Sequence, residues 1–363
     1  MKLKIGFIGL GLIGGSIAKA IRQYYPEYEI VAFDKNKETL ALATQESIID
    51  VAATTIDDNF HHCSYIFLCA PVSYNTAYLK QIKGYLHDGC ILTDVGSVKT
   101  NIHREVEALG IEPYFIGGHP MAGSEKSGYS NAKAMLIENA YYVLTPTSKV
   151  PQEKIDNYVN FVRDLRAIPI ILDYQEHDQV TGTISHLPHI IASSLVNFVR
   201  DTDTKDELMK NLAAGGFKDI TRIASCSPEM WEQICMTNTE NILVLLKRYI
   251  TSLESICDTL ENHNGDAIYK MFEESGKYRS TFPNRGQGPI ERDYSFCVDV
   301  LDEPGSISVL SAILAAKGIS VKNIGINHSR EEGEGALRIS FYKEDKKNEA
   351  AELLKSHNYV LTK

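Results

Sequence analysis

The sequence predicts an α/β protein in three parts: a doubly wound parallel sheet over residues 1–173, an all-α region over residues 174–278, and a small β-α-β-β-α-β unit over residues 294–363. Three observations lead to this prediction. Short apolar runs alternate with helical patterns as far as residue 173, and the strand signal then disappears over the second part. Residues 279–293 mix Gly, Pro and charge without periodicity, which is typical of a linker.

The composition is that of a packed globular chain, and it excludes several classes of protein. A length of 363 residues is enough for two or three domains, with 44% hydrophobic and 23% charged residues. The formal net charge is −10 and no window is strongly basic, so nucleic acid is not an expected partner. Seven cysteines without C-x-x-C spacing indicate core thiols of a reducing compartment. Because no apolar run reaches the roughly 18 residues of a membrane span, we expect a cytoplasmic protein without a membrane partner.

Seven apolar runs predict the strands of the first part, and they cover residues 4–8, 30–33, 65–69, 90–94, 114–117, 141–144 and 168–172. Helical patterns lie between most of them, for example over residues 14–25, 37–44, 74–83 and 150–166. Strands that alternate with helices indicate a parallel sheet with helices covering its faces.

A glycine-rich turn follows the first predicted strand and opens the first helix. Gly9 permits the tight turn, Gly11 lets backbone N–H groups approach a pyrophosphate, and Gly14 lets the helix pack closely on the strand. The glycines also argue against a secretory signal, which residues 1–20 otherwise imitate. The spacing predicts a Rossmann-type dinucleotide site lined by the whole turn: Gly9, Leu10, Gly11, Leu12, Ile13 and Gly14.

The second predicted strand ends at Asp34, 20 residues after the last glycine of the turn. A carboxylate there can accept hydrogen bonds from ribose hydroxyls and repels a 2′-phosphate, so NAD is favoured over NADP. Ala70 and Pro71, directly after the third predicted strand, are assigned to the same cofactor site. Lys35 and Asn36 lie beside the carboxylate and leave some use of NADP open.

Two polar segments follow later strands of the same sheet. Residues 93–99, TDVGSVK, contain Ser97, and residues 117–128, GGHPMAGSEKSG, contain His119. Because ligands gather beyond the carboxyl ends of parallel strands, we expect both side chains to face the nicotinamide. An imidazole can accept a hydroxyl proton while the neighbouring hydrogen leaves as hydride, and the serine can orient the ring or share the hydroxyl. The alternatives are a helix N-cap serine and a loop histidine satisfied by backbone groups.

The all-α region begins with three histidines, His177, His186 and His189. Ser185 is a plausible N-cap and Pro188 is tolerated in a first helical turn, which would place the last two histidines near a helix N-terminus. Their H-x8-H-x2-H spacing matches no strong metal-ligand pattern, so we expect no metal. Binding of an anionic substrate, or gating of its pocket, is the favoured role of Ser185, His186 and His189.

A second candidate binding segment covers residues 215–222, GGFKDITR. Arg222 offers a planar fork suited to a bidentate grip on a carboxylate, and Lys218 adds a further positive charge. Trp231, the only tryptophan, lies nine residues beyond the arginine. The alternatives are a solvent-facing arginine and a core tryptophan.

Two segments of the all-α region, residues 188–200 and 228–263, are apolar on most of their circumference. Helices of this kind are buried, and a region of about 100 residues is small to bury two of them alone. We therefore expect the region to pack against a second copy of itself in a homodimer.

The last unit reads as strand, helix, strand, hairpin, strand, helix and strand, over residues 294–301, 307–317, 319–327, 333–335, 336–342, 346–357 and 359–362. This is the ferredoxin-like split βαβ order. Backbone and amide groups near its first helix and in its second strand could take the carboxylate and ammonium of an amino acid. The candidate effector residues are Asp302, Pro304, Gly305, Ser306 and Asn323. The alternative is a dimerisation module without a ligand.

Taken in order, these motifs resemble the prephenate dehydrogenase family. The resemblance covers the whole length and rests on GFIGLGLIGGSIAKA, LTDVGSVK, GGHPMAGSEKSG, HDQVTGTISHLPH and GGFKDITRIASCSPEMW. The last unit looks like an ACT domain, a module that commonly binds amino acids. Tyrosine, the end product of the family's pathway, is the effector that we expect as allosteric inhibitor.

The resemblance implies oxidative decarboxylation of prephenate by NAD⁺ to 4-hydroxyphenylpyruvate, CO₂ and NADH. In the family, the histidine matching His119 is the hydrogen-bond acceptor or base, and the serine matching Ser97 positions the substrate hydroxyl. The arginine matching Arg222 binds a substrate carboxylate, and His189 matches a further histidine of the substrate pocket. Because a dianionic substrate meets an acidic protein here, Arg222, Lys218 and the nearby histidines must supply local attraction.

Three other functions are alternatives to the oxidation of prephenate. The nearest is the same chemistry on arogenate, which carries an amino group where prephenate has a keto group. A β-hydroxyacid dehydrogenase has a similar glycine-rich start, but the catalytic lysine of its G-x-x-x-K-x-x-x-N helix is not found in a comparable place. A non-catalytic NAD-binding sensor is disfavoured by the joint presence of Ser97, His119 and Arg222.

Overall fold

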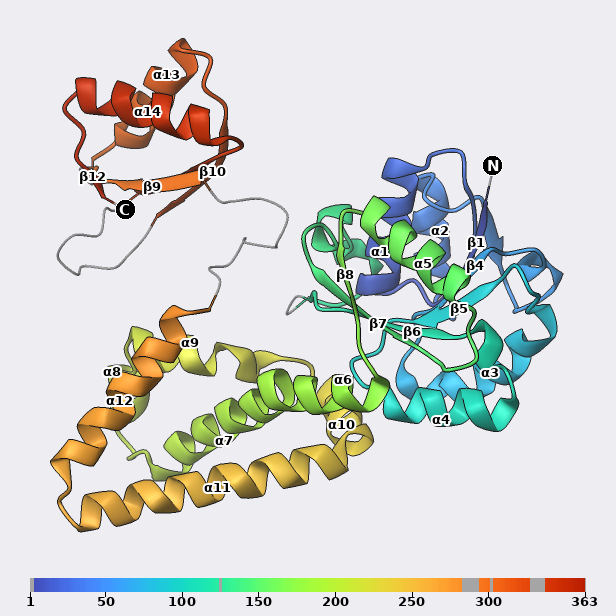
Figure 1. Cartoon of the computed structure of the whole chain (residues 1–363), viewed down its shortest axis with the longest axis horizontal. Coiled ribbons are helices and arrows are strands. Elements are labelled where there is room, and N and C mark those ends of the chain that lie inside the picture. Colours follow the sequence, from blue (N-terminus) through green and yellow to red (C-terminus); the bar gives the residue numbers. More distant parts are fainter. Residues whose placement is uncertain (1–2, 124–125, 283–293, 301–302, 327–336, 363) are drawn as a thin grey trace. The chain divides into compact units, whose positions relative to one another are not determined.

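Figure 1 shows the computed structural model, which describes residues 3–123, 126–282, 294–300, 303–326 and 337–362. The chain divides into two compact units, Met1–Ser280 and Thr281–Lys363. The first unit holds the predicted sheet and the helical region, and the second holds the small α/β unit. Among the described residues, no helix combines the length and the apolar character that crossing a membrane requires.

Five parallel strands form the larger sheet of the first unit, in the order β3-β2-β1-β4-β5. They are β1 (Lys4–Ile8), β2 (Glu29–Phe33), β3 (Val51–Ala53), β4 (Tyr65–Leu68) and β5 (Ile91–Asp94). The sequence predicts four of these strands; the three-residue β3 is too short to produce an alternation of its own. Because β1 lies in the middle, the chain leaves it first toward β2 and later toward β4, which makes the doubly wound order.

Helices cover both faces of this sheet (Figure 1). One face carries α1 (Leu12–Tyr24), α2 (Lys37–Gln45) and α5 (Gln152–Asp164), and the other carries α3 (Asn75–Ile82) and α4 (Thr100–Leu109). Neighbouring residues of one strand therefore join different cores. Phe7 stacks on Phe67 of β4 under the first face, with ring centroids 5.0 Å apart, whereas Ile8 and Leu68 belong to the core of the second.

The strands after β5 depart from the predicted all-parallel sheet. β6 (Ile116–Pro120) pairs antiparallel with β7 (Tyr141–Pro146), which pairs parallel with β8 (Ile168–Ile171). A single bridge between Leu92 and Phe115 connects them to β5. The physical reason is the connection: its described residues, 121–123 and 126–140, contain only short 3₁₀ turns and no crossover helix, so the chain returns in the opposite direction.

The start of β6 also corrects the prediction of a strand over residues 114–117. Glu112–Tyr114 forms a 3₁₀ turn, in which Pro113 takes the second position, and the strand begins two residues later than predicted and runs through Pro120. His119 therefore lies within the strand, paired with Val143, and not in a loop after it.

The helical region opens with one continuous helix, formed by α6 (Tyr174–Thr181), a π-helical turn (Gly182–His186) and α7 (Leu187–Thr202). Asp173 caps its start by accepting hydrogen bonds from Gln175 and Glu176 N–H groups. The predicted N-cap at Ser185 is therefore wrong, because the residue lies inside the helix. The wider π turn ends at His186, two residues before Pro188, whose missing N–H and ring disturb the regular ladder.

Five more helices complete the region: α8 (Leu208–Leu212), α9 (Gly215–Thr221), α10 (Pro228–Thr237), α11 (Thr239–Glu261) and α12 (Gly265–Ser280). The predicted helix over residues 228–263 is broken at Asn238, and α12 extends through Ser280, so it includes the first two residues of the predicted linker. The expected burial is not reached within one chain. α11 buries only Ile242, and α12 buries no residue.

The second unit is a four-stranded antiparallel sheet in the order β10-β11-β9-β12, with two helices. Its elements are β9 (Tyr294–Val298), α13 (Ser306–Ala316), β10 (Val321–Ile326), β11 (Leu337–Phe341), α14 (Glu344–Ser356) and β12 (Leu361–Thr362). This is the β-α-β-β-α-β order that the sequence predicts. The predicted hairpin at Gly333 and Gly335 and the effector candidate Asp302 lie outside the described residues.

Candidate functional site

The glycine turn between β1 and α1 has the geometry that its spacing predicts. Gly9 has a φ of +96°, and a Cβ there would lie 2.9 Å from the backbone nitrogen of Ala70. A Cβ on Gly14 would lie 2.7 Å from the Gly9 carbonyl oxygen, so both positions need glycine for the helix to reach the strand ends. A Cβ on Gly11 would meet no atom within 4 Å. The N-terminus of α1, which has no side-chain cap, therefore faces an open space that a side chain would fill.

Asp34 joins the end of β2 to this turn. Its Oδ2 accepts a hydrogen bond from the Leu10 N–H at 2.7 Å, and its Oδ1 accepts one from the Asn36 N–H at 2.8 Å. Each carboxylate oxygen keeps a second lone pair, so the half-buried side chain can still accept bonds from the hydroxyls of a ribose. Lys35 places its Nζ 3.5 Å from the centroid of the Tyr74 ring. These residues fit a dinucleotide with a free 2′-hydroxyl.

The other predicted cofactor residues lie around the same turn. Leu12 and Ile13 form the first turn of α1, and Leu10 is buried directly before it. Ala70 and Pro71 follow β4, which pairs with β1, so the turns after these two strands lie side by side.

His119 lies at the centre of a buried polar cluster between the sheet and α6. Its Nδ1 is 2.8 Å from Nε2 of His177, and Nδ1 of His177 is 2.8 Å from Oδ1 of Asp178. His177 and Asp178 are fully buried, whereas His119 keeps part of its surface exposed. Burial, together with the nearby His177, Lys99 and His186, holds the pKa of His119 well below its usual value. The imidazole is therefore neutral at physiological pH and can accept a proton.

A buried ion pair lies beside this cluster. The fully buried Lys99 donates a hydrogen bond from Nζ to Asp94 at the end of β5. Asp94 also accepts hydrogen bonds from the N–H groups of Gly96, at 2.9 Å, and Gly118, at 3.1 Å. One carboxylate thus holds the loop that carries Ser97 against the strand that carries His119.

Ser97 is half-buried in this loop and is not the N-cap of the following helix. α4 begins after Lys99, and its first N–H groups are satisfied from elsewhere in the fold: Asp178 accepts bonds from the N–H groups of Lys99, at 2.7 Å, and Thr100, at 2.8 Å. The Ser97 hydroxyl is therefore not engaged as a helix cap.

Two predicted substrate residues, His186 and His189, contact the indole of Trp231, which is itself a predicted substrate residue. His189 stacks on it with ring centroids 3.8 Å apart, and His186 meets it edge-on at 6.0 Å. Burial, with the charge of Arg222 nearby, lowers the pKa of His189, although the hydrogen bond from its Nδ1 to the Ser185 carbonyl at 2.8 Å opposes the shift. Ser185 thus contributes its carbonyl oxygen here. The buried indole Nε1 of Trp231 makes no hydrogen bond within the described part of the protein.

The structure places the remaining candidates as follows. Arg222 begins the 3₁₀ turn after α9 and is exposed, and Lys218 is exposed on α9 itself. Pro304, Gly305 and Ser306 surround the start of α13, where Gly305 has a φ of +99°, and Asn323 lies in β10. In the described ranges, no group of His, Cys, Asp and Glu side chains is arranged to hold a metal ion.

From the sequence, His177 was expected only to share the binding or gating role of the neighbouring histidines, and no role was expected of Asp178, Asp94, Lys99 or Asn238. Asn238, at the break before α11, donates from Nδ2 to the Asp178 carbonyl at 2.9 Å and contacts Nδ1 of His186 at 3.0 Å. The sequence does carry a signal for Asp94 and Lys99. An aspartate at a strand end is followed five residues later by a lysine, and both have apolar neighbours. No local signal marks Asn238, because its partners lie 52 and 60 residues away.

Comparisons with known proteins cover both parts of the first unit. Residues 17–171 match the family model of the prephenate dehydrogenase nucleotide-binding domain, and residues 173–274 match that of the prephenate dehydrogenase dimerization domain. The prephenate dehydrogenase of Bacillus subtilis (strain 168) is 38% identical over 98% of this chain and 96% of its own length. The prephenate dehydrogenase of Lactococcus lactis subsp. cremoris (strain MG1363) is 39% identical over 97% of this chain and 97% of its own length.

Solved structures with the same fold include two dehydrogenases. The prephenate dehydrogenase from A. aeolicus, in complex with hydroxyphenyl propionate and NAD⁺, has a TM-score of 0.72 and 29% identity, over 77% of this chain and 98% of its own. The Synechocystis arogenate dehydrogenase has a TM-score of 0.70 and 29% identity, over 77% of this chain and 100% of its own.

The buried ion pair generates a prediction about stability. Asp94→Asn leaves the Lys99 ammonium buried without its carboxylate, and we expect the free energy of unfolding to fall by about 3–5 kcal/mol. Urea unfolding followed by circular dichroism measures the change. Asp94→Asn combined with Lys99→Met should recover much of the loss, and Asp201→Asn at the exposed Arg200–Asp201 pair should have no measurable effect. An unchanged unfolding midpoint in Asp94→Asn would show that the pair does not stabilise the fold.

Proposed function

Because the chain belongs to the prephenate dehydrogenase family, we propose that it oxidises prephenate with NAD⁺ in the cytoplasm, forming 4-hydroxyphenylpyruvate, CO₂ and NADH on the route to tyrosine. It is an NAD-dependent oxidoreductase of aromatic amino acid biosynthesis. The observation that carries the proposal is the place of His119. This neutral imidazole lies on β6, beside the carboxyl ends of the parallel strands where the dinucleotide site is built.

The residues of the glycine turn and the end of β2 hold the cofactor in this proposal. The open space at Gly11 takes the pyrophosphate, and Asp34 accepts hydrogen bonds from the adenosine ribose. Leu10, Leu12, Ile13, Ala70 and Pro71 line the groove around them. Bound NAD⁺ supplies the hydride acceptor.

Ser97 and His119 act on the hydroxyl of the substrate ring. Ser97 orients the hydroxyl, and His119 accepts its proton while the hydrogen on the same carbon leaves with two electrons. The ring carboxylate then departs as CO₂, and the electrons of the broken C–C bond make the ring aromatic. The proton returns from His119 to the same oxygen, which becomes the phenol. Aromatisation makes the reaction effectively irreversible, so these residues mainly position groups and place charge.

The helical region binds the rest of the substrate. Arg222 holds a carboxylate with its planar fork, and Lys218 adds attraction that the protein as a whole, with a net charge of −10, does not supply. His189, His186 and Ser185 form the adjoining wall. The buried N–H of Trp231 points to a hydrogen-bond acceptor on the ligand, because an unsatisfied buried donor is costly.

Arogenate is the second candidate substrate, and the similarity to the Synechocystis arogenate dehydrogenase favours testing it. It differs from prephenate in the side chain, where an amino group replaces the keto group. A single contact at the end of that side chain can decide between the two. NADH formation measured by absorbance, with each compound in turn, distinguishes them.

His119→Asn tests the central step. The variant keeps a polar side chain but loses the proton acceptor, so we expect kcat with prephenate to fall on the order of 10²–10⁴-fold while the Kd for NAD⁺ stays within about twofold. Absorbance of NADH and fluorescence titration of NAD⁺ measure the two quantities. His61→Asn, at a surface histidine, is the control and should behave as wild type. Unchanged turnover in His119→Asn would refute the assignment.

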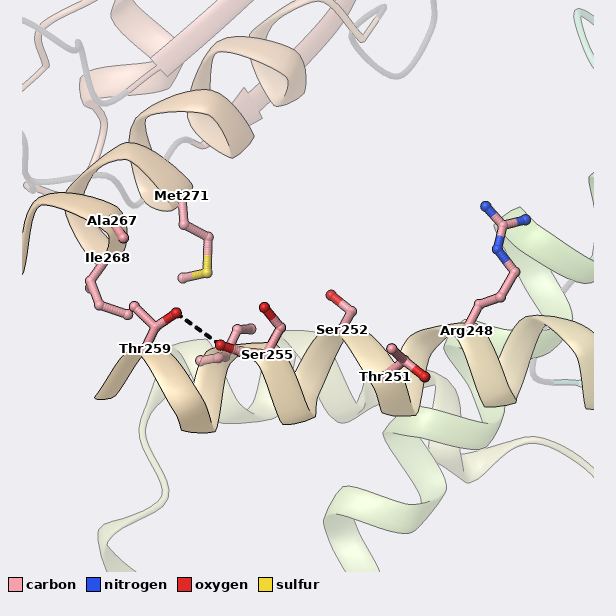
Figure 2. Close-up of a pocket in the computed structure, with 9 residues that line it drawn as sticks. Arg248, Thr251, Ser252, Ser255, Thr259, Ala267, Ile268 and Met271 are labelled. Atoms are coloured by element: carbon pink, nitrogen blue, oxygen red, sulfur yellow. Dashed lines mark hydrogen bonds between the residues drawn. The ribbon is translucent and has the colours of Figure 1, made fainter. Parts of the chain in front are cut away.

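We also propose that the helical region forms a homodimer. Large apolar side chains are exposed along its long helices: Phe198, Leu243, Val244, Ile250, Leu253, Leu260, Tyr269 and Phe272. A groove of about 500 Å³ runs between α11 and α12, lined by Ser252, Ser255 and Thr259 of one helix and by Ile268 and Met271 of the other (Figure 2). Apolar faces of this extent in a soluble enzyme are suited to a second copy.

Phe272→Glu tests the dimer. A charge on α12 would have to be buried in the interface, so we expect the variant to shift toward monomer in size-exclusion chromatography with light scattering. Met135→Glu is the matched control, because Met135 is 68% exposed on the first part of the unit and Phe272 is 67% exposed. A wild-type monomer at micromolar concentration would contradict the proposal.

For the second unit we propose a ferredoxin-like ACT domain that binds tyrosine as a feedback inhibitor. Its element order and its strand order β10-β11-β9-β12 support this assignment. The effector would contact Asp302, Pro304, Gly305, Ser306 and Asn323.

Removal of residues 294–363 tests this regulation. The shortened enzyme should keep its prephenate oxidation but lose inhibition by tyrosine, because the site for the effector is gone. Full-length Asn323→Ala should show the intermediate result, a higher tyrosine concentration for half-inhibition. Initial rates over a range of tyrosine concentrations measure both effects, and undiminished inhibition of the shortened enzyme would place the effector elsewhere.

A further inference from the structure

We propose that His177 and Asp178 are positioning residues that set the tautomer of His119, so that its Nε2 is always the proton acceptor. The proposal deepens the proposed function, on which it rests for the role of His119. The three side chains form a relay, Asp178–His177–His119, with 2.8 Å between the atoms at each step. With one proton on each imidazole ring, hydrogen-bond chemistry allows only one arrangement of protons along it.

The relay begins at Asp178, which is ionised. Burial raises its pKa, but hydrogen bonds from His177, from Thr100 and from the Lys99 N–H outweigh this effect and hold the pKa below its usual value. An ionised carboxylate can only accept hydrogen bonds. Nδ1 of His177, at 2.8 Å from Oδ1 of Asp178, must therefore carry a proton.

The next two positions follow from the first. With a single proton on the His177 ring, held at Nδ1, its Nε2 is bare and accepts a hydrogen bond. Its neighbour at 2.8 Å, Nδ1 of His119, must then be the donor. His119 is neutral because its pKa is held well below the usual value, so its second nitrogen, Nε2, has a free lone pair. The reversed arrangement is excluded, since it would set a bare Nδ1 of His177 against the carboxylate.

Burial makes the relay rigid. His177 and Asp178 are fully buried, so water cannot replace either hydrogen bond. The Asp178 carboxylate is also fixed by the start of α4, through the N–H groups of Lys99 and Thr100, and its carbonyl oxygen accepts a bond from Asn238. His177 can therefore hold the ring of His119 in one orientation and one tautomer.

The relay also stabilises the positive charge that forms on His119 during the reaction. When His119 accepts a proton, the new positive charge faces the Lys99 ammonium and His186, whose pKa burial lowers to about 4. The carboxylates of Asp94 and Asp178 are the negative groups of this cluster. Only Asp178 is connected to His119 by hydrogen bonds, through His177, and it offsets the transient charge.

Variants of His177 separate positioning from packing. His177→Gln can keep an acceptor near Nδ1 of His119, whereas His177→Leu fills similar space without one. We expect His177→Leu to lower kcat on the order of 10²-fold or more, with KM for prephenate and Kd for NAD⁺ within about twofold, and His177→Gln to recover at least tenfold of that loss. His103→Gln is the control, because His103 is a buried histidine that bonds to Thr145 and lies outside the relay.

Asp178→Asn gives a readout that does not depend on turnover. Its amide can donate to Nδ1 of His177, which permits the opposite tautomers in both rings. Nitrogen-15 histidine spectra of the full-length protein, with the His119 signals assigned by their absence in His119→Asn, should show a bare Nε2 in wild type and a protonated Nε2 in Asp178→Asn. If wild type oxidises neither prephenate nor arogenate, the proposed function fails, and the spectra still test the relay. A bare Nε2 in Asp178→Asn, or a kcat of His177→Leu close to that of wild type, would overturn the inference.

Discussion

One buried carboxylate, Asp178, connects the two parts of the first unit. It accepts hydrogen bonds from the backbone N–H groups of Lys99 and Thr100, at the start of the sheet-side helix α4, and from the ring of His177 on its own helix. Its carbonyl oxygen binds Asn238 at the start of α11. An ionised group without water must have all of its partners in place, so this single side chain sets the position of the helical region against the strand ends. The proposed catalytic histidine lies directly on that junction.

The sheet region and the helical region, which meet there, differ in how much apolar surface they bury within one chain. Helices cover both faces of the sheet region, which buries its apolar residues within one chain. Alternate residues of β1 belong to the cores on opposite faces. The helical region leaves most of α11 and all of α12 without burial, although it carries the proposed contacts for substrate carboxylates. In the proposed dimer, the cofactor site is built within one chain, whereas the exposed helix faces of the substrate-binding region meet a second copy.

Much of the candidate site was predictable, because its residue types are tied to strand ends. Gly9, Gly11 and Asp34 follow from a spacing that dinucleotide binding imposes, and the structure places them around one turn. His119 and Ser97 were found as polar residues after strands, although His119 proved to lie inside β6. The prediction of Ser185 as an N-cap failed because a helix start was inferred from a serine and a proline, while the actual start is Asp173, twelve residues earlier. The helix continues through that proline, which lies in the first turn of α7, directly after a π turn.

The sequence by itself determined the alternation of strands and helices, the glycine turn with its carboxylate, and the order of the motifs along the chain. Each of these depends on residues that are close together, through periodicity, backbone freedom or turn chemistry. Only the tertiary structure decided the direction of β6 against β7, the pairing of Lys99 with Asp94, and the meeting of His119 with His177 and Asp178. The atoms of this last contact come from residues 58 apart, and no local pattern records which two buried polar groups will satisfy each other.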